Sequence, residues 1–139
     1  MKYLLDTSVI KELISKQPNQ NVVNFVDSLD QEDMYLSAIT VGEIAKGIQK
    51  LLDQPRKKIL ERWLHEYLLT RFDGNILALD TQILIRWGEI TAKLENAGIK
   101  EMAALDSLIL ATALTHRLVL VTMYESDFEK TGIEIVNPW

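Results

Sequence analysis

Residues 2–10 read KYLLDTSVI, an apolar run that ends on a carboxylate and two hydroxyls. The run before Asp6 predicts a short buried strand, because a brief apolar run bounded by a turn signal is typical of one. Asp6, Thr7 and Ser8 are common helix N-caps, so they predict the end of the strand and a helix that starts near Val9. A buried strand that leads straight into a helix is the repeating unit of α/β folds.

The same alternation of strands and helices continues along the rest of the chain. Further strands are predicted at 34–39, 76–79, 118–121 and 133–136, and helices at 19–29, from Thr40 onward, and at 57–69, 81–96 and 102–116. Residues 1–139 are therefore predicted to form a single α/β domain, with a mostly parallel central sheet flanked by helices.

Composition narrows the class of protein. The chain of 139 residues is 47% apolar and 25% charged, which is ordinary for one globular domain. It has no cysteine, and its two histidines, His65 and His116, lack the spacing of a zinc site. The apolar N-terminal run is too short for a signal peptide, and no stretch approaches the roughly 20 apolar residues of a membrane span. We expect a cytoplasmic protein that makes no contact with a membrane.

The net charge of −5 argues against an extended nucleic-acid surface, because proteins that grip phosphates are usually basic. It leaves room for a local acidic pocket that holds a cation. Basic residues do gather within residues 46–62, where they form either a solvated helix face or a phosphate-contacting patch: Lys46, Lys50, Arg56, Lys57, Lys58 and Arg62.

Two carboxylates follow predicted strands, where ligands bind in open parallel sheets. Asp6 comes directly after the first strand, and taken alone it favours a plain helix N-cap. Glu43 ends the segment Thr40-Val41-Gly42-Glu43, which matches a capping box with Thr40 as the N-cap and Glu43 three residues later. A glutamate in the first helical turn would also project near the strand end, so both roles remain open.

Asp106 is the most informative acidic residue. Residues 102–114 read MAALDSLILATAL, in which only Asp106, Ser107 and Thr112 are polar. A helix that is apolar on nearly every side is buried, and burying a carboxylate is costly unless it is paired or binds a cation. No basic residue lies three or four positions away, so the pattern favours a functional role over a simple place in the first helical turn.

A further polar group follows the predicted strand at 118–121. It contains Thr122, Glu125 and Asp127, although Asp127 could also serve as a turn or cap residue. Together with the earlier acids, three or four carboxylates are predicted at one sheet edge, and only Lys46 is locally placed to neutralise any of them. Crowded carboxylates need protons or a cation, and an all-oxygen set suits Mg²⁺ or Mn²⁺. Such an ion can activate water and assist in-line phosphoryl transfer.

At these residues the chain resembles the PIN-domain family, and within it the VapC-type toxin ribonucleases of toxin–antitoxin pairs. The resemblance spans the chain in order, at YLLDTSVI (3–10), SAITVGEI (37–44), AALDSLI (103–109), LVT (120–122) with Asp127-Phe128, and GIEIVNPW (132–139). It implies a PIN-like three-layer sandwich and cleavage of tRNA or another structured RNA with Mg²⁺ or Mn²⁺. It also implies a homodimer and a VapB-like antitoxin that inserts near the acidic pocket.

The resemblance also assigns roles to residues. It implies that Asp6, Glu43 and Asp106 are the metal-binding catalytic residues, that Asp127 supplies a fourth acidic group, and that Thr7, Ser8 and Thr122 are supporting hydroxyls. The chain departs from the family after Thr122, where a basic or small residue and then Asn or Asp are usual and Met123 and Tyr124 stand instead. The departure concerns the second metal and the rate more than the class of reaction.

Three other functions compete with this one. A catalytically weak module that mainly binds an antitoxin is supported by Met123 and Tyr124, and a nuclease assay with and without Mn²⁺ separates it from an enzyme. A receiver-like phosphoacceptor would need adjacent acids after the first strand and a late lysine, whereas Asp6 precedes Thr7 and no lysine lies between 118 and 129. A serine hydrolase is poorly supported, because the chain has no Gly-x-Ser-x-Gly motif.

Overall fold

The central sheet is entirely parallel. The computed structural model describes residues 1–99 and 102–139. Its five strands have the order β3-β2-β1-β4-β5, and every neighbouring pair runs parallel. The strands are β1 (Tyr3–Leu5), β2 (Met34–Ser37), β3 (Ile76–Leu77), β4 (Val119–Val121) and β5 (Ile135–Val136). The structure confirms the predicted α/β class, and each predicted strand is present in a shorter form.

Alternate residues of the central strands belong to two different hydrophobic cores, because successive side chains of a strand point to opposite faces of the sheet. Leu5 of β1 and Val121 of β4 belong to the first core, and Leu4 and Leu120 belong to the second. All four side chains are fully buried. The apolar run at the start of the chain is therefore continuous because both of its faces are covered.

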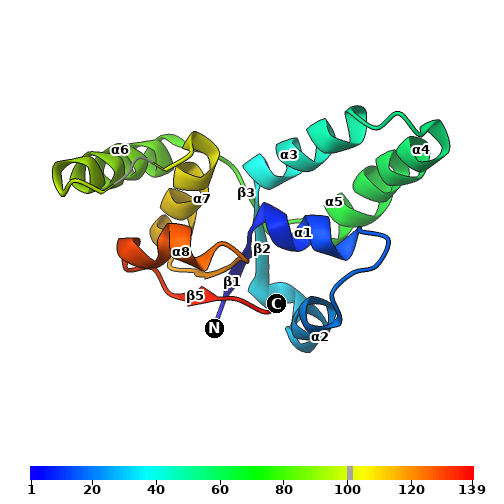
Figure 1. Ribbon diagram of the computed structural model, residues 1–139, viewed down its shortest axis with the longest axis horizontal. Coiled ribbons are helices and arrows are strands. Elements are labelled where there is room, and N and C mark those ends of the chain that lie inside the picture. Colours follow the sequence, from blue (N-terminus) through cyan, green and yellow to red (C-terminus); the bar gives the residue numbers. More distant parts are fainter. Residues whose placement is uncertain (100–101) are drawn as a thin grey trace.

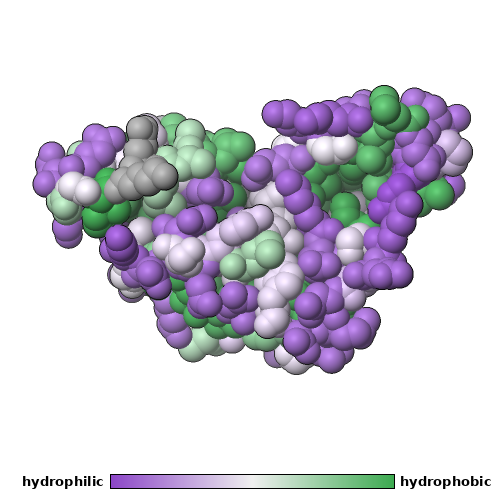
Figure 2. Space-filling view, in the orientation of Figure 1, coloured by the Kyte–Doolittle hydropathy of each residue, from purple (hydrophilic) through white to green (hydrophobic). Residues whose placement is uncertain are grey.

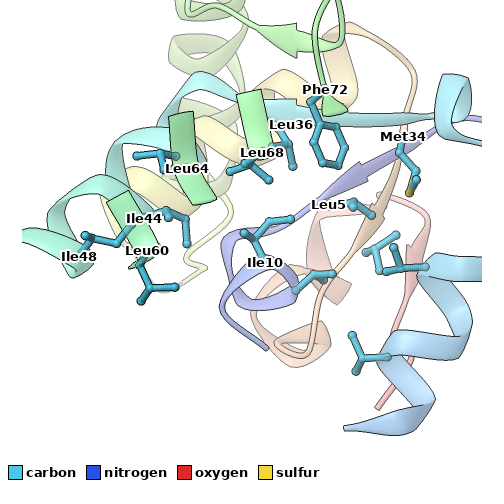
Figure 3. Packing of buried hydrophobic residues seen from close by; sticks show 14 residues of the cluster. Leu5, Ile10, Met34, Leu36, Ile44, Ile48, Leu60, Leu64, Leu68 and Phe72 are labelled. Atoms are coloured by element: carbon cyan, nitrogen blue, oxygen red, sulfur yellow. The ribbon is translucent and has the colours of Figure 1, made fainter. Parts of the chain in front are cut away.

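Helices cover both faces of the sheet and form three layers with it. The first core, shown in Figure 3, is closed by helices from the first half of the chain, and the second core is closed by helices from the second half. The first set is α1 (Thr7–Leu13), α2 (Gln20–Ser28), α3 (Ala38–Gln49), α4 (Gln54–Arg62), the π-helical turn η2 (Trp63–Leu68) and α5 (Leu69–Arg71). The second set is α6 (Thr81–Asn96), α7 (Ala104–Thr115) and α8 (Glu125–Phe128), and the 3₁₀ turns are η1 (Gln31–Asp33) and η3 (Glu129–Thr131).

Side-chain caps explain why two of the helices start earlier than predicted. Helix α3 begins at Ala38, and the Ser37 hydroxyl caps it by accepting from the Ile39 N–H at 3.1 Å. The predicted capping box was therefore wrong, because a serine at the end of β2 caps the helix earlier and leaves Thr40 inside its first turn. Helix α4 begins at Gln54 rather than at residue 57, since Asp53 supplies its cap.

The arrangement places two helical arms on either side of α1. Helices α6 and α7 form one arm and α3 and α4 the other, with the start of α1 between them (Figure 1). Helices α6 and α7 pack closely on each other, as do α3 and α4. None of the helices within residues 1–99 and 102–139 is long and apolar enough to cross a membrane.

Candidate active site

The predicted acidic residues lie near the ends of parallel strands, at or in the helices that follow them. Asp6 stands between β1 and α1, Glu43 lies on α3, Asp106 lies in the first turn of α7, and Asp127 lies on α8. The surface is hollowed between the arm that carries α7 and the arm that carries α3 (Figure 2). The parallel topology thus brings residues from distant parts of the chain to one edge of the sheet.

Asp6 is held by hydroxyls. Its side chain is only 3% exposed, and its Oδ2 accepts from the Thr122 hydroxyl at 2.7 Å and from the Ser8 hydroxyl at 3.2 Å. It occupies the N-cap position of α1, but its carboxylate makes no capping hydrogen bond. Burial raises the pKa of Asp6, the negative charge of Glu43 raises it further, and the Thr122 and Ser8 hydrogen bonds oppose both effects. The backbone N–H of Thr7 also lowers the pKa, so the strongest contacts of the carboxylate are with side-chain hydroxyls, and the start of the helix contributes as well.

Glu43 is joined to the start of α1 through threonine hydroxyls. The Thr7 hydroxyl donates to Glu43 Oε1 at 2.7 Å, and the Thr40 hydroxyl lies 3.0 Å from the Thr7 hydroxyl. Because Thr7 gives its proton to the carboxylate, Thr40 donates to Thr7. Thr40 is fully buried and shares the inner face of α3 with Glu43, three residues on. Sequence reasoning missed this role for Thr40, although its spacing from Glu43 was the available signal.

Asp106 lies in a more open position than its apolar neighbours suggested. The first turn of α7 is exposed at Ala104 and Leu105, and full burial begins further along the helix. Partial burial raises the pKa of Asp106, and the charges of Asp6, Glu43 and Asp127 raise it further. The N-terminal end of the α7 dipole favours the carboxylate in this position. The four acids therefore sense one another electrostatically across the site.

A tryptophan supports the helix turn that carries Asp106. The indole N–H of Trp87, on α6, donates to the Ser107 hydroxyl at 2.8 Å, and that hydroxyl donates to the Ala104 carbonyl at 2.8 Å. Ser107 is buried, so the pair fastens α6 to the first turn of α7. This contact was also missed, because it joins residues 20 positions apart in different helices.

The residues that depart from the family pattern stand on the surface beside Asp6. Met123 is 41% exposed and Tyr124 is 49% exposed. The Tyr124 N–H donates to the Thr122 hydroxyl at 3.1 Å, and that hydroxyl in turn donates to Asp6. The backbone of Tyr124 thus belongs to the same hydrogen-bond chain as the buried carboxylate.

The donor set suits a hard cation, but it is not closed around one. In the part of the chain that the structure describes, no three His, Asp or Glu side chains converge closely enough to hold a metal ion. Asp6 and Glu43 are instead turned toward their hydroxyl partners. Every candidate ligand is an oxygen, which fits Mg²⁺ or Mn²⁺ better than a softer ion. Within the same residues no lysine, arginine or histidine forms an ion pair with Asp6, Glu43 or Asp106.

The basic residues at 46–62 divide into two groups. Three of them make contacts within the chain: Arg56 donates to the Ile14 carbonyl at 3.0 Å, Lys57 donates to the Gln49 carbonyl at 3.3 Å, and Arg62 pairs with Glu66. The other three are exposed and have no hydrogen bond or ion pair among the described residues: Lys46, Lys50 and Lys58. Both interpretations of this segment, the solvated face and the phosphate patch, therefore remain open for them.

Comparison with known proteins gives a consistent result along the whole chain. The model of the family described as "PIN domain" matches residues 3–134. Toxin FitB of Neisseria gonorrhoeae is 40% identical over 136 residues, covering 98% of this chain and 97% of FitB. The VapC ribonuclease Y4jK of Sinorhizobium fredii is 33% identical, covering 98% of this chain and 96% of the relative.

Solved structures agree with these relatives. A crystal structure of FitAcB from Neisseria gonorrhoeae superposes with a TM-score of 0.94 at 40% identity and covers 99% of this chain and 98% of that one. A toxin–antitoxin complex from Klebsiella pneumoniae superposes with a TM-score of 0.68 at 27% identity, covering 99% of this chain and 98% of that one.

Proposed function

Because the chain belongs to the PIN-domain family, we propose that it is a metal-dependent endoribonuclease and the toxin of a VapBC-type toxin–antitoxin pair. Its substrate would be tRNA or another structured RNA. One observation carries the proposal: Asp6 and Asp106, on different elements, both have a raised pKa because they are desolvated and lie near other carboxylates. Carboxylates gathered at cost to stability are typical of a site that binds a cation or moves protons.

The roles follow from the contacts of each side chain. Asp6, Glu43 and Asp106 would hold Mg²⁺ or Mn²⁺, and Asp127 would contribute a fourth acidic group. Such an ion supplies Lewis acidity to the phosphoryl group and to the attacking water. The hydroxyls of Thr122 and Ser8 would keep Asp6 oriented.

Glu43 would be positioned in the same way, by the hydroxyls of Thr7 and Thr40. The Thr7 hydroxyl fixes one carboxylate oxygen, and Thr40 fixes the Thr7 hydroxyl in turn. Each supporting hydroxyl leaves further lone pairs of the carboxylate free for a ligand, because a carboxylate has about four acceptor sites.

The partner and the compartment are part of the proposal. FitAcB and the toxin–antitoxin complex from Klebsiella pneumoniae are similar along nearly their whole length, which supports a VapB-like antitoxin as the partner of this chain. A homodimer and a cytoplasmic location, which the resemblance to VapC-type toxins implies, complete the proposal.

A weakly catalytic, antitoxin-binding module is the second candidate, and Met123 and Tyr124 favour it. Purified chain would be incubated with total tRNA in Mn²⁺, Mg²⁺ or EDTA, beside Asp106→Asn and the control Asp27→Asn, an exposed acid on α2. The ribonuclease proposal predicts cleavage by wild type and Asp27→Asn that EDTA and Asp106→Asn abolish. An intact substrate in all lanes, with a folded protein, would favour the binding module. Sequencing of RNA ends after induction in a bacterial host would then identify the RNA.

A further inference from the structure

A cavity of about 320 Å³ opens beside Asp106. Residues of α6, α7 and α8 line it, and Figure 1 shows these three helices on the same side of the molecule. Asp106 forms one part of its wall and Asp127 another. The cavity therefore shares two acidic residues with the proposed active site.

The wall of the cavity has two chemical characters. Leu94, Ile99 and Met102 contribute an apolar part, and all three side chains are partly buried. Ser126 and Lys130, from the α8–η3 segment, contribute polar groups beside Asp127. Its volume is at the lower end of the range of about 300–1,000 Å³ in which small ligands bind.

We propose that this cavity receives an unpaired nucleobase of the RNA beside the scissile phosphate. The proposal rests on the ribonuclease function proposed above. The apolar wall suits the faces of a base, and the polar groups suit its edge. Asp127 can accept from an exocyclic amino group, and Lys130 can donate to a ring nitrogen or a base carbonyl. Sequence-selective proteins generally read RNA through unstacked bases of this kind.

The chemistry of the cavity wall favours a base over two other occupants, a phosphate group and a cationic side chain of a protein partner. A phosphate inside the cavity would be buried against Leu94, Ile99 and Met102, whose apolar side chains offer it no hydrogen-bond donor. A cationic side chain of a protein partner would be drawn to the two aspartates, but it would face Lys130 and would leave the apolar wall uncovered. A base is neutral, has flat apolar faces, and carries both donors and acceptors on its edge.

Binding of the base can be followed at a methionine methyl group. The chain has four methionines, of which Met102 lines the cavity and Met34 is buried in the other core. In wild-type protein labelled with [methyl-¹³C]methionine, at least one of AMP, CMP, GMP and UMP should shift the Met102 signal and leave Met34 in place. Ribose 5-phosphate should not shift it. The signal is assigned with Met102→Leu.

Two results of this titration would overturn the proposal. One is a Met102 signal that no nucleotide moves. The other is a Met102 signal that moves with triarginine and not with nucleotides, which would assign the cavity to a protein partner. The titration needs no cleavage, so it tests the cavity even if the nuclease assay fails.

Cleavage provides the second test. Ser126 is exposed on α8 at the cavity, so Ser126→Trp should fill the cavity without removing a carboxylate. Gln82→Trp is the matched control, because Gln82 is an exposed residue beside a different cavity, near Arg86 and Arg117. We expect Ser126→Trp to raise KM at least tenfold or to change the base preferred at the cut, and Gln82→Trp to do neither. If both variants are folded and cut like wild type, the base does not enter the cavity.

Discussion

Replacing Asp6 with asparagine distinguishes between two roles for this residue, a metal ligand and a plain helix cap. The Asp6 carboxylate is buried, and its pKa is raised from 3.8. The folded state therefore binds this proton more tightly than the unfolded state does, and stability falls as pH rises from about 3.8 through the raised pKa. Asparagine keeps the volume and can still accept from Thr122, but it carries no charge. In EDTA at neutral pH, Asp6→Asn should melt at or above the temperature of wild type.

The size of the expected effect is the rise in melting temperature that Mn²⁺ causes in each protein. An ion that binds only the folded state adds about 2.7 kcal/mol at a hundredfold excess over its dissociation constant. For a domain of this size that is about 10 °C of melting temperature, at about 4 °C per kcal/mol. If Asp6→Asn weakens the site about thirtyfold, the same Mn²⁺ concentration adds only about 0.9 kcal/mol. Its melting temperature would then rise by only about 3–4 °C.

Melting curves in EDTA and in a Mn²⁺ series provide the measurement, with Asp27→Asn as the control that should follow wild type. A plain helix cap predicts a different outcome, because asparagine caps about as well as aspartate and the Mn²⁺ response would be undiminished. An equal Mn²⁺ shift in wild type and Asp6→Asn would remove Asp6 from the proposed metal site. It would also remove the main support for the nuclease mechanism.

Three further changes test the site and its surroundings. Asp106→Asn should abolish RNA cleavage in a gel assay and leave the circular dichroism spectrum unchanged; wild-type cleavage by a folded variant would show that Asp106 is not a ligand. Tyr124→Asn should keep or raise activity, because it restores the residue usual in the family, and a loss beyond about tenfold, or about 1.4 kcal/mol of barrier, would give Tyr124 its own role. The indole N–H of Trp139 donates to Glu12 at 3.0 Å and lowers its pKa, so Glu12 adds stability that is present at neutral pH and lost as pH falls through the lowered value. Urea unfolding should therefore show Glu12→Gln less stable than wild type at pH 7, with a gap that closes in acid; a gap independent of pH would contradict this.

The sheet, and the edge of it near which the acidic residues lie, could be predicted because they depend on local patterns. An apolar strand followed by Asp6 predicts a strand, a turn and a helix from neighbouring residues alone, and the parallel topology then brings the strand ends together. The start of α3 could not be settled in this way. Ser37 and Thr40 are both good N-caps, and the choice depends on where β2 leaves the sheet.

The hydrogen-bond network could not be predicted because it joins residues that are distant in the sequence. The contacts of Thr7 with Thr40 and of Trp87 with Ser107 depend on how helices pack, which no local pattern specifies. The exposure of the first turn around Asp106 was missed for the same reason. The apolar composition of residues 102–114 indicates a buried helix, but not which of its ends reaches the surface.

The hydrogen bond from Thr122 to Asp6 joins residues 116 positions apart, and strand β1 pairs with β4 in the register Tyr3↔Val119. During synthesis β1 can therefore meet its neighbour β2 early, but its other neighbour, β4, is made much later. The carboxylate of Asp6 has no Thr122 hydroxyl to orient it, and Asp106 has not yet been translated for most of that time. The proposed site would be complete only after β4 has emerged and paired with β1. The order of the strands thus postpones assembly of the proposed site until synthesis is nearly complete.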